Sequence, residues 1–229
     1  MSASDTTSHF WIASDPFFST TLLVAPESTG VSEDKACSSL ELYDVDGVRV
    51  NSVDVEFPPE QVGVIELEPF MSALKMQGGV RHGHVALVSQ GQAQHMCRYA
   101  LHEQISLTRA PTIVRSRESC FVPLVIGGQR EHVVALVNSG LETSQIALRV
   151  FYANRSPEWN LALPPNGCKL IALEDELLCD TDDKAWEKGP LQSYIRLSAR
   201  HQTVFSCVVF ERIPGNTPQL DSYRCVTSW

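Results

Sequence analysis

Hydrophobic and polar residues alternate along several short segments of this chain. In 144–151 and 159–163 the strongly apolar residues occupy every second position. A period of two with one apolar face is typical of an antiparallel strand that is buried on one side. In 48–57 the apolar positions shift from even to odd numbers, which predicts a bulge near Asn51 and Ser52. We therefore expect many short strands, with helix restricted to 68–76 and 174–188.

The strand pattern occurs twice in the same order. Pro58-Pro59 matches Pro164-Pro165, and an apolar run ending in an acidic residue follows each pair. The block Val85–Cys97 likewise matches Ile195–Cys207. Several matching blocks in one order indicate a tandem duplication rather than a solenoid, which needs more repeats.

The duplication divides the chain into repeats 1–112 and 113–229. About six short strands in a unit of this size suit a β-sandwich. The expected fold is therefore all-β, a tandem duplication of two antiparallel β-sandwich domains. Polar segments at 89–92 and 199–202 are the expected hairpin turns.

The second repeat contains a recognisable run over 133–173, VVALVNSGLETSQIALRVFYANRSPEWNLALPPNGCKLIAL, with an apolar strand that ends in Asn138. This run resembles the bacterial immunoglobulin-like or fibronectin-like sandwich modules that recur in tandem. Together with Phe10-Trp11-Ile12-Ala13 it also resembles the sensory-rhodopsin-transducer type of small β-sandwich. The latter resemblance implies assembly and ligand or partner binding rather than catalysis. The first repeat departs from the pattern, because Ala25-Pro26 replaces Asn138-Ser139, and no functional residue carries over.

Composition and charge exclude several classes of protein. The chain has 229 residues, of which 43% are hydrophobic, so it can bury enough apolar surface to fold. A net charge of −9 without a run of Lys or Arg argues against a nucleic-acid partner. No apolar stretch approaches the roughly 20 residues of a membrane span. We see no signal peptide, so a cytoplasmic location with seven reduced cysteines is expected.

Motifs for catalysis are missing from the sequence. There is no Gly-x-Ser-x-Gly elbow, His-Glu-x-x-His helix or Cys-x-x-Cys pair. The loop 78–84 has two glycines but lacks the Lys-Ser/Thr that holds phosphate. The acidic segment 180–183 fails the calcium-loop spacing. We therefore expect no catalytic residues, no cofactor and no enzyme activity.

One histidine-rich segment suggests a metal site. If 83–101 forms a hairpin that turns at Gln90-Gly91, a single sheet face carries His82, His84, His95 and Cys97. Imidazole and thiolate groups suit Zn²⁺ or copper. A slip of one residue would scatter the set over both faces, and partly exposed strand histidines are the alternative.

Three aromatic residues are candidates for stacking on a small ligand or carbohydrate: Trp159, Trp186 and Tyr194. Packing in a core or interface is the alternative for each of them. Three functions therefore stay open. The preferred hypothesis is a non-enzymatic interaction or assembly protein that binds a protein partner or itself, as a homo-oligomer. A small-ligand or carbohydrate-binding module and a metal-binding protein are the others.

Overall fold

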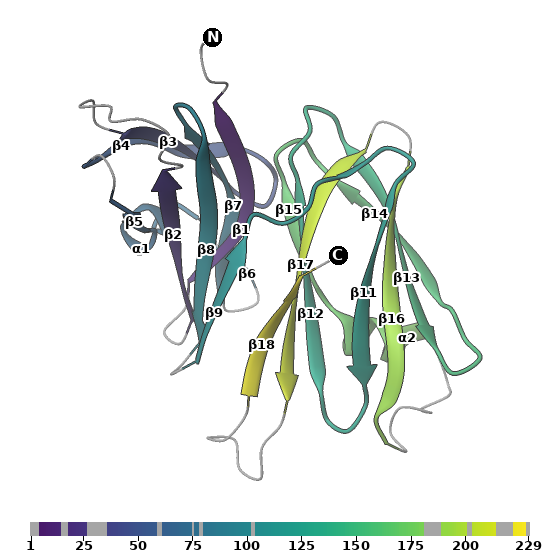
Figure 1. Ribbon diagram of the computed structural model, residues 1–229. Coiled ribbons are helices and arrows are strands. Elements are labelled where there is room, and N and C mark those ends of the chain that lie inside the picture. The colour runs from purple at the N-terminus through teal and green to yellow at the C-terminus, as the bar shows by residue number, and fades with distance from the viewer. Residues whose placement is uncertain are drawn as a thin grey trace. The chain divides into compact units, whose positions relative to one another are not determined.

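The computed structural model describes most of the chain and is built almost entirely of strands (Figure 1). The described residues are 5–14, 18–26, 36–58, 61–74, 76–77, 80–101, 104–180, 189–200, 203–213 and 222–227. The chain folds as two compact units, Met1–Ala110 and Pro111–Trp229. Their boundary lies two residues before the one expected from the sequence.

The first unit contains two antiparallel sheets. Its elements are β1 (Thr6–Ser14), β2 (Phe18–Pro26), β3 (Ala36–Tyr43), β4 (Arg49–Phe57), β5 (Gly63–Glu66), α1 (Glu68–Met71), β6 (Met76–Gln77), β7 (Val80–Ser89), β8 (Ala93–Leu101) and β9 (Gln104–Arg109). Sheet A has the strand order β1-β7-β3-β4, with β6 also paired to β7. Sheet B has the order β5-β2-β8-β9.

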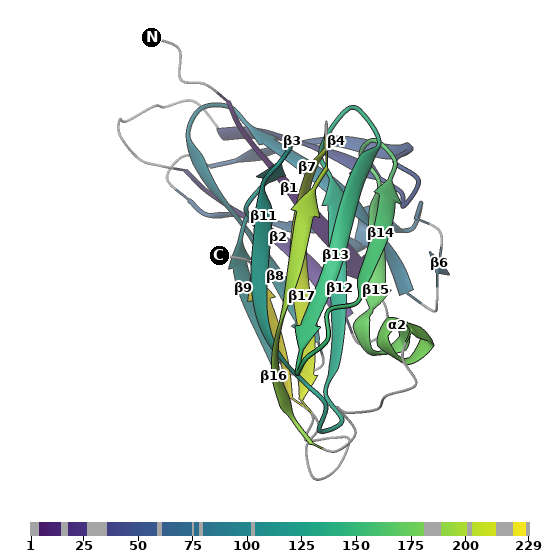
Figure 2. The same ribbon diagram turned by 90° about the vertical axis from the view of Figure 1, so that its right-hand side faces the viewer.

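The second unit repeats this plan (Figure 2). Its elements are β10 (Val114–Arg115), β11 (Ser119–Ile126), β12 (Glu131–Asn138), β13 (Ser144–Tyr152), β14 (Glu158–Leu163), β15 (Cys168–Ala172), α2 (Leu173–Asp180), β16 (Leu191–Ala199), β17 (Val204–Ile213) and β18 (Ser222–Thr227). Sheet D has the order β11-β16-β13-β14, and sheet C the order β10-β17-β12-β15, with β18 also paired to β17.

The two units share one topology. Sheet D reproduces the order of sheet A, and sheet C reproduces that of sheet B apart from the added β10. A short helix follows the fifth main strand in each unit. The predicted all-β fold with two duplicated antiparallel sandwiches is therefore confirmed.

The predicted hairpin turns are wrong. Strand β7 lies in sheet A and β8 in sheet B, and β16 and β17 are divided in the same way between sheets D and C. The chain therefore passes from one sheet to the other between β7 and β8, and again between β16 and β17. The reason is that polar turn residues mark a reversal of the chain but do not say whether the two strands pair.

An apolar core lies between the two sheets of each sandwich. In the first, Phe10, Ile12, Leu22, Val85 and Leu87 are completely buried. In the second, the core includes residues from β11, β12, β13, β16, β17 and α2: Val122, Leu136, Leu148, Leu177, Leu197 and Phe205. Burying a side chain of this size contributes about 1.5–3 kcal/mol, so these layers supply most of the stabilisation.

Two local features match the sequence pattern. The pairing of β3 with β4 slips between Leu42, opposite Asn51, and Tyr43, opposite Arg49, so the bulge lies within a residue of its predicted place. Asn138 is completely buried at the end of β12. Its Nδ2 donates to the carbonyl oxygens of Glu142, Leu163 and Pro164 at 2.8, 3.1 and 2.8 Å, which joins two loops of the second sandwich.

Candidate functional site

Three aromatic rings form a ladder across the outer face of sheet D. The rings of Phe151 and Tyr194 are stacked, with centroids 4.5 Å apart and planes inclined by 12°. Phe121 lies on the other side of Tyr194, 6.1 Å between centroids. Phe121 is 50% exposed and Tyr194 is 40% exposed. We call Phe121, Tyr194 and Phe151 the aromatic ladder.

Strand alternation places the ladder. Phe151 pairs directly with Tyr194 across β13 and β16, and Pro123 of β11 pairs with Tyr194 from the other side. Their neighbours Val150 and Ile195 point the opposite way and are completely buried. Because successive residues of a strand face opposite sides, the aromatic residues next to this buried inner row lie on the outer face.

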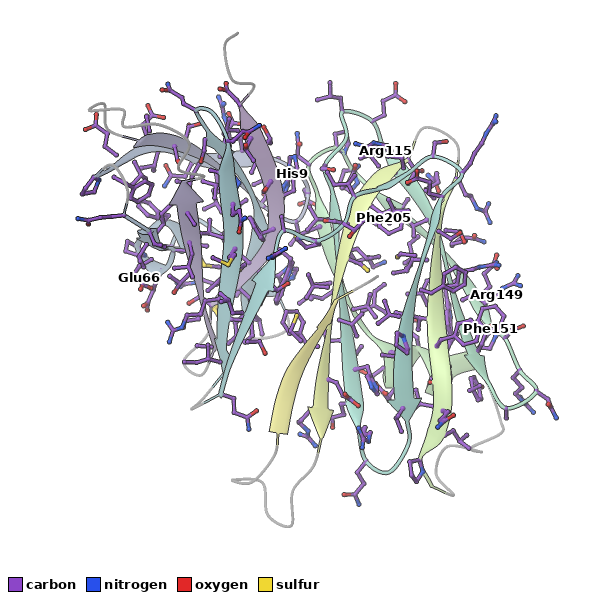
Figure 3. The ribbon with its side chains drawn as sticks, viewed as in Figure 1. His9, Glu66, Arg115, Arg149, Phe151 and Phe205 are labelled. Carbon is purple, nitrogen blue, oxygen red and sulfur yellow. The ribbon has the colours of Figure 1, made fainter. Side chains whose placement is uncertain are left out.

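Arginines flank the ladder. The guanidinium carbons of Arg149 and Arg196 each lie 5.8 Å from the centre of the Phe151 ring, within cation–π range. Arg149 also donates to Glu158 through Nε, at 2.6 Å. Figure 3 shows Arg149 and Phe151 on the side of β13 that faces away from the core. Among the described residues, Arg196 makes no ion pair with a carboxylate, so its charge is available to a partner.

Sheet A of the first unit carries rings at the equivalent positions. His84 of β7 stacks on Tyr43 of β3, with centroids 5.2 Å apart and planes inclined by 18°. On its other side, Nε2 of His84 is 2.9 Å from Nδ1 of His9, so one imidazole donates to the other. Burial lowers the pKa of His9. Burial, followed by the hydrogen bond to Glu41, raises the pKa of Tyr43 to about 12.

The structure separates the four predicted metal ligands. His82 and His84 lie on the outer face of sheet A, where Nε1 of Trp11 donates to Nδ1 of His82 at 3.3 Å. His95 and Cys97 lie on the core side of sheet B, paired with Val24 and Leu22. The assumed hairpin register between 83 and 101 is therefore wrong, because the two strands belong to different sheets. Nowhere in the described ranges do three His, Cys, Asp or Glu residues gather as metal ligands.

His95 instead takes part in a buried chain of hydroxyl groups. Its Nε2 lies 2.8 Å from Oγ of Ser89, which lies 2.7 Å from Oγ of Ser38. Nδ1 of His95 has no hydrogen-bond partner. Burial lowers the pKa of His95 to about 4, so the ring is neutral near pH 7.

The three predicted stacking residues do not form one site. Trp159 pairs with Leu148 and packs against the core on the inner side of sheet D. Tyr194 belongs to the aromatic ladder on the outer side. Trp186 lies outside the described residues. The sequence predicted Tyr194 but not Phe121 and Phe151, because alternation places each of them on the outer face of its own strand and only strand pairing brings the three rings together.

A second polar site, which the sequence reasoning missed, lies at one end of the second sandwich. His132 is completely buried, and its Nδ1 is 2.6 Å from Oε1 of Glu174 in α2. The backbone N–H of His132 donates to Oε2 of the same carboxylate at 2.7 Å. Glu211, opposite His132 on β17, is also buried and pairs with Arg130 at 2.6 Å. A pocket of about 1010 Å³ opens beside this network, between the 127–130 turn with the start of β12 and the start of α2.

Comparisons with known proteins assign no relative to this chain. No family model, curated protein or solved structure matches it. In the part of the chain that the structure describes, no helix is long and apolar enough to cross a membrane.

Proposed function

We propose that this protein is a non-enzymatic assembly protein whose chains associate through the outer face of sheet D. The observation that carries the proposal is the aromatic ladder with Arg149 and Arg196 beside it. Tyr and Arg are the residue types that most often dominate the binding energy of protein interfaces. A row of aromatic rings on the outer face of a sheet, two of them well exposed, gives a partner surface a large contact area at a small entropic cost.

The aromatic rings of this face favour a second copy of the chain as the partner. Among the described residues, Arg196 has no carboxylate partner, whereas Glu158 on the edge strand β14 is paired with Arg149 and lies 3.8 Å from Arg200. A two-fold axis through the face would bring the two ladders together, so that the rings of one copy pack on those of the other.

Carbohydrate binding is the weaker alternative for the ladder. A sugar stacks on the open face of an aromatic ring. The near-parallel Phe151 and Tyr194 cover one face of each other at 4.5 Å, and Arg149 and Arg196 lie close to the Phe151 ring. The exposed parts of these rings suit packing against another protein better.

Sedimentation velocity over a range of protein concentrations tests the proposal. We expect a reversible dimer, and we expect Tyr194→Ser to weaken it by at least about thirtyfold, as removal of an interface aromatic does. Ile105→Ser is the matched control, because Ile105 is 59% exposed on β9 of the other unit. A wild-type chain that stays monomeric at the highest concentration would overturn the proposal. So would a dimer whose affinity Tyr194→Ser leaves unchanged.

A further inference from the structure

The polar residues at one end of the second sandwich are buried, which costs free energy. Glu211 has no exposed side-chain area, and His132 has none either. Removing charged groups from water carries a penalty that a buried pair recovers only partly, so apolar residues often fill such places equally well. A buried ionic network at this position therefore needs another reason.

The first sandwich shows that the fold itself does not require these charges. In the second unit His132 pairs with Glu211, four residues beyond the pair Leu136–Cys207. In the first unit Phe18 pairs with Leu101, four residues beyond the corresponding pair Leu22–Cys97. The same step of the same topology therefore has Phe and Leu in one copy and His and Glu in the other.

The buried residues hold two partly exposed groups, Glu174 and Arg130, in fixed places. His132 binds both carboxylate oxygens of Glu174, through its ring and its backbone N–H. Glu211 holds Arg130 through a single nitrogen, NH1. Glu174 and Arg130 both line the pocket, and their side chains are 18% and 25% exposed. Bonds from buried residues to the side chains that line a pocket fix the geometry of a binding site.

Both groups keep unused hydrogen-bonding capacity. Each carboxylate oxygen has two lone pairs, so each oxygen of Glu174 can accept one more hydrogen bond. Arg130 has five N–H groups, and the ones on Nε and the second terminal nitrogen remain beside its bond to Glu211. Nε2 of His132 also lacks a hydrogen-bond partner, 3.5 Å from Oε1 of Glu211.

The rest of the pocket adds charge of both signs. Glu131 and Arg212 pair across its rim at 3.1 Å, and Asp175 lies next to Glu174 in the first turn of α2. The opposite wall is the turn Gly127–Arg130, closed by a 3.3 Å bond from the N–H of Arg130 to the carbonyl of Gly127. Gly128 in this turn has a φ of 62°, a conformation that favours glycine. Because glycine has no side chain, its backbone lines the pocket directly.

We propose that this pocket binds a small zwitterion of the α-amino acid class. The ammonium group of the ligand donates to Glu174 and Asp175, and its carboxylate accepts from Arg130. A pocket with a fixed carboxylate and a fixed guanidinium discriminates against ligands that carry one charge alone, because one of its own groups then stays unpaired. This site is separate from the aromatic ladder and does not depend on self-association.

Titrations followed by ¹H–¹⁵N NMR of the full chain test the proposal. The probes are L-alanine, L-glutamine and two analogues of alanine that each lack one charged group, propionate and ethylamine. We expect saturable shifts of the amide signals of Gly127, Gly128 and Ala172 with both amino acids. The affinity for propionate and for ethylamine should be at least about tenfold lower.

Two variants and a control locate the ligand. Glu174→Gln should weaken alanine binding by at least about tenfold, because it removes the charge that faces the ammonium group. Arg130→Lys keeps a positive charge opposite Glu211 but loses the planar fork, and should also weaken binding. Glu176→Gln is the matched control, since Glu176 is exposed on the same helix and does not line the pocket.

Three results would overturn the proposal. The first is the absence of saturable shifts at the pocket amides with either amino acid. The second is ethylamine or propionate binding as tightly as alanine, which would make the site specific for a single charge. The third is unchanged alanine affinity in both Glu174→Gln and Arg130→Lys, judged on variants whose dispersed NMR spectra show that they are folded.

Discussion

The stability of the first sandwich should depend on pH through His95. Burial lowers the pKa of this ring from 6.5 to about 4, and the side chain is only 4% exposed in the folded protein. The unfolded chain therefore binds the proton more tightly than the folded one. The contribution is fully present above the unfolded pKa and is lost as the pH falls from 6.5 toward 4.

The magnitude follows from the two pKa values. Linkage gives a loss of unfolding free energy of about 2 kcal/mol at about pH 5 and about 3 kcal/mol at about pH 4. His95→Gln removes this titration, because an amide does not ionise in this range. The difference in unfolding free energy between the wild type and the variant should therefore change by about 2 kcal/mol between about pH 7 and about pH 5, in the direction that favours the variant at low pH.

Urea denaturation at several pH values, fitted with one transition for each unit, measures this difference. The carboxylates titrate in both proteins, so they cancel in the comparison. Met96→Leu, at the neighbouring position of β8 that faces away from the core, should follow the wild type at every pH. Parallel curves for the wild type and His95→Gln would refute the reasoning, because they would show that His95 titrates alike in the folded and unfolded states.

Three further substitutions or treatments test the packing. Asn138→Ala should lower the unfolding free energy of the second sandwich by about 2–4 kcal/mol in urea titrations, since buried carbonyls lose their donor, and a loss below about 0.5 kcal/mol would contradict this role. Gly83→Ala should destabilise the first sandwich by at least about 2 kcal/mol, because its Cβ would lie 2.5 Å from the carbonyl oxygen of Tyr43; wild-type thermal stability would contradict it. Diamide should oxidise the thiols of Cys120 and Cys207, 3.8 Å apart, to an intramolecular disulfide found by peptide mass mapping; both thiols remaining alkylatable would contradict it.

The sequence predicts the strands and the duplication well, because both depend on local information. Alternation of apolar residues reports which side of a strand is buried, and it placed the β3–β4 irregularity within a residue of Asn51. Pairing between strands is different. The turn at 89–92 looks like a hairpin in either topology, since the choice of sheet is made by contacts of β7 with β1 and β3.

The candidate sites were harder to predict for the same reason. Tyr194 was identified as an aromatic in a strand. The ladder also needs Phe121 of β11 and Phe151 of β13, which lie on either side of β16 only in the folded sheet. His132, Glu174 and Glu211 are separated by tens of residues, and no motif connects them. Their association follows from the pairing of β12 with β17 and from the position of α2, which local patterning does not encode.

The division of β7 and β8 between two sheets has a kinetic consequence. Strand β1 pairs with β7, so that Thr6 lies opposite Ser89, and in the second unit Ser119 lies opposite Ser198. Neither sheet can be completed until almost the whole unit has left the ribosome. Loops of this length must close before their contacts stabilise anything, which slows folding to about milliseconds or seconds. During synthesis, the apolar faces of the early strands therefore stay exposed until their partner strands have been made. The nascent chain is most prone to aggregation during this interval.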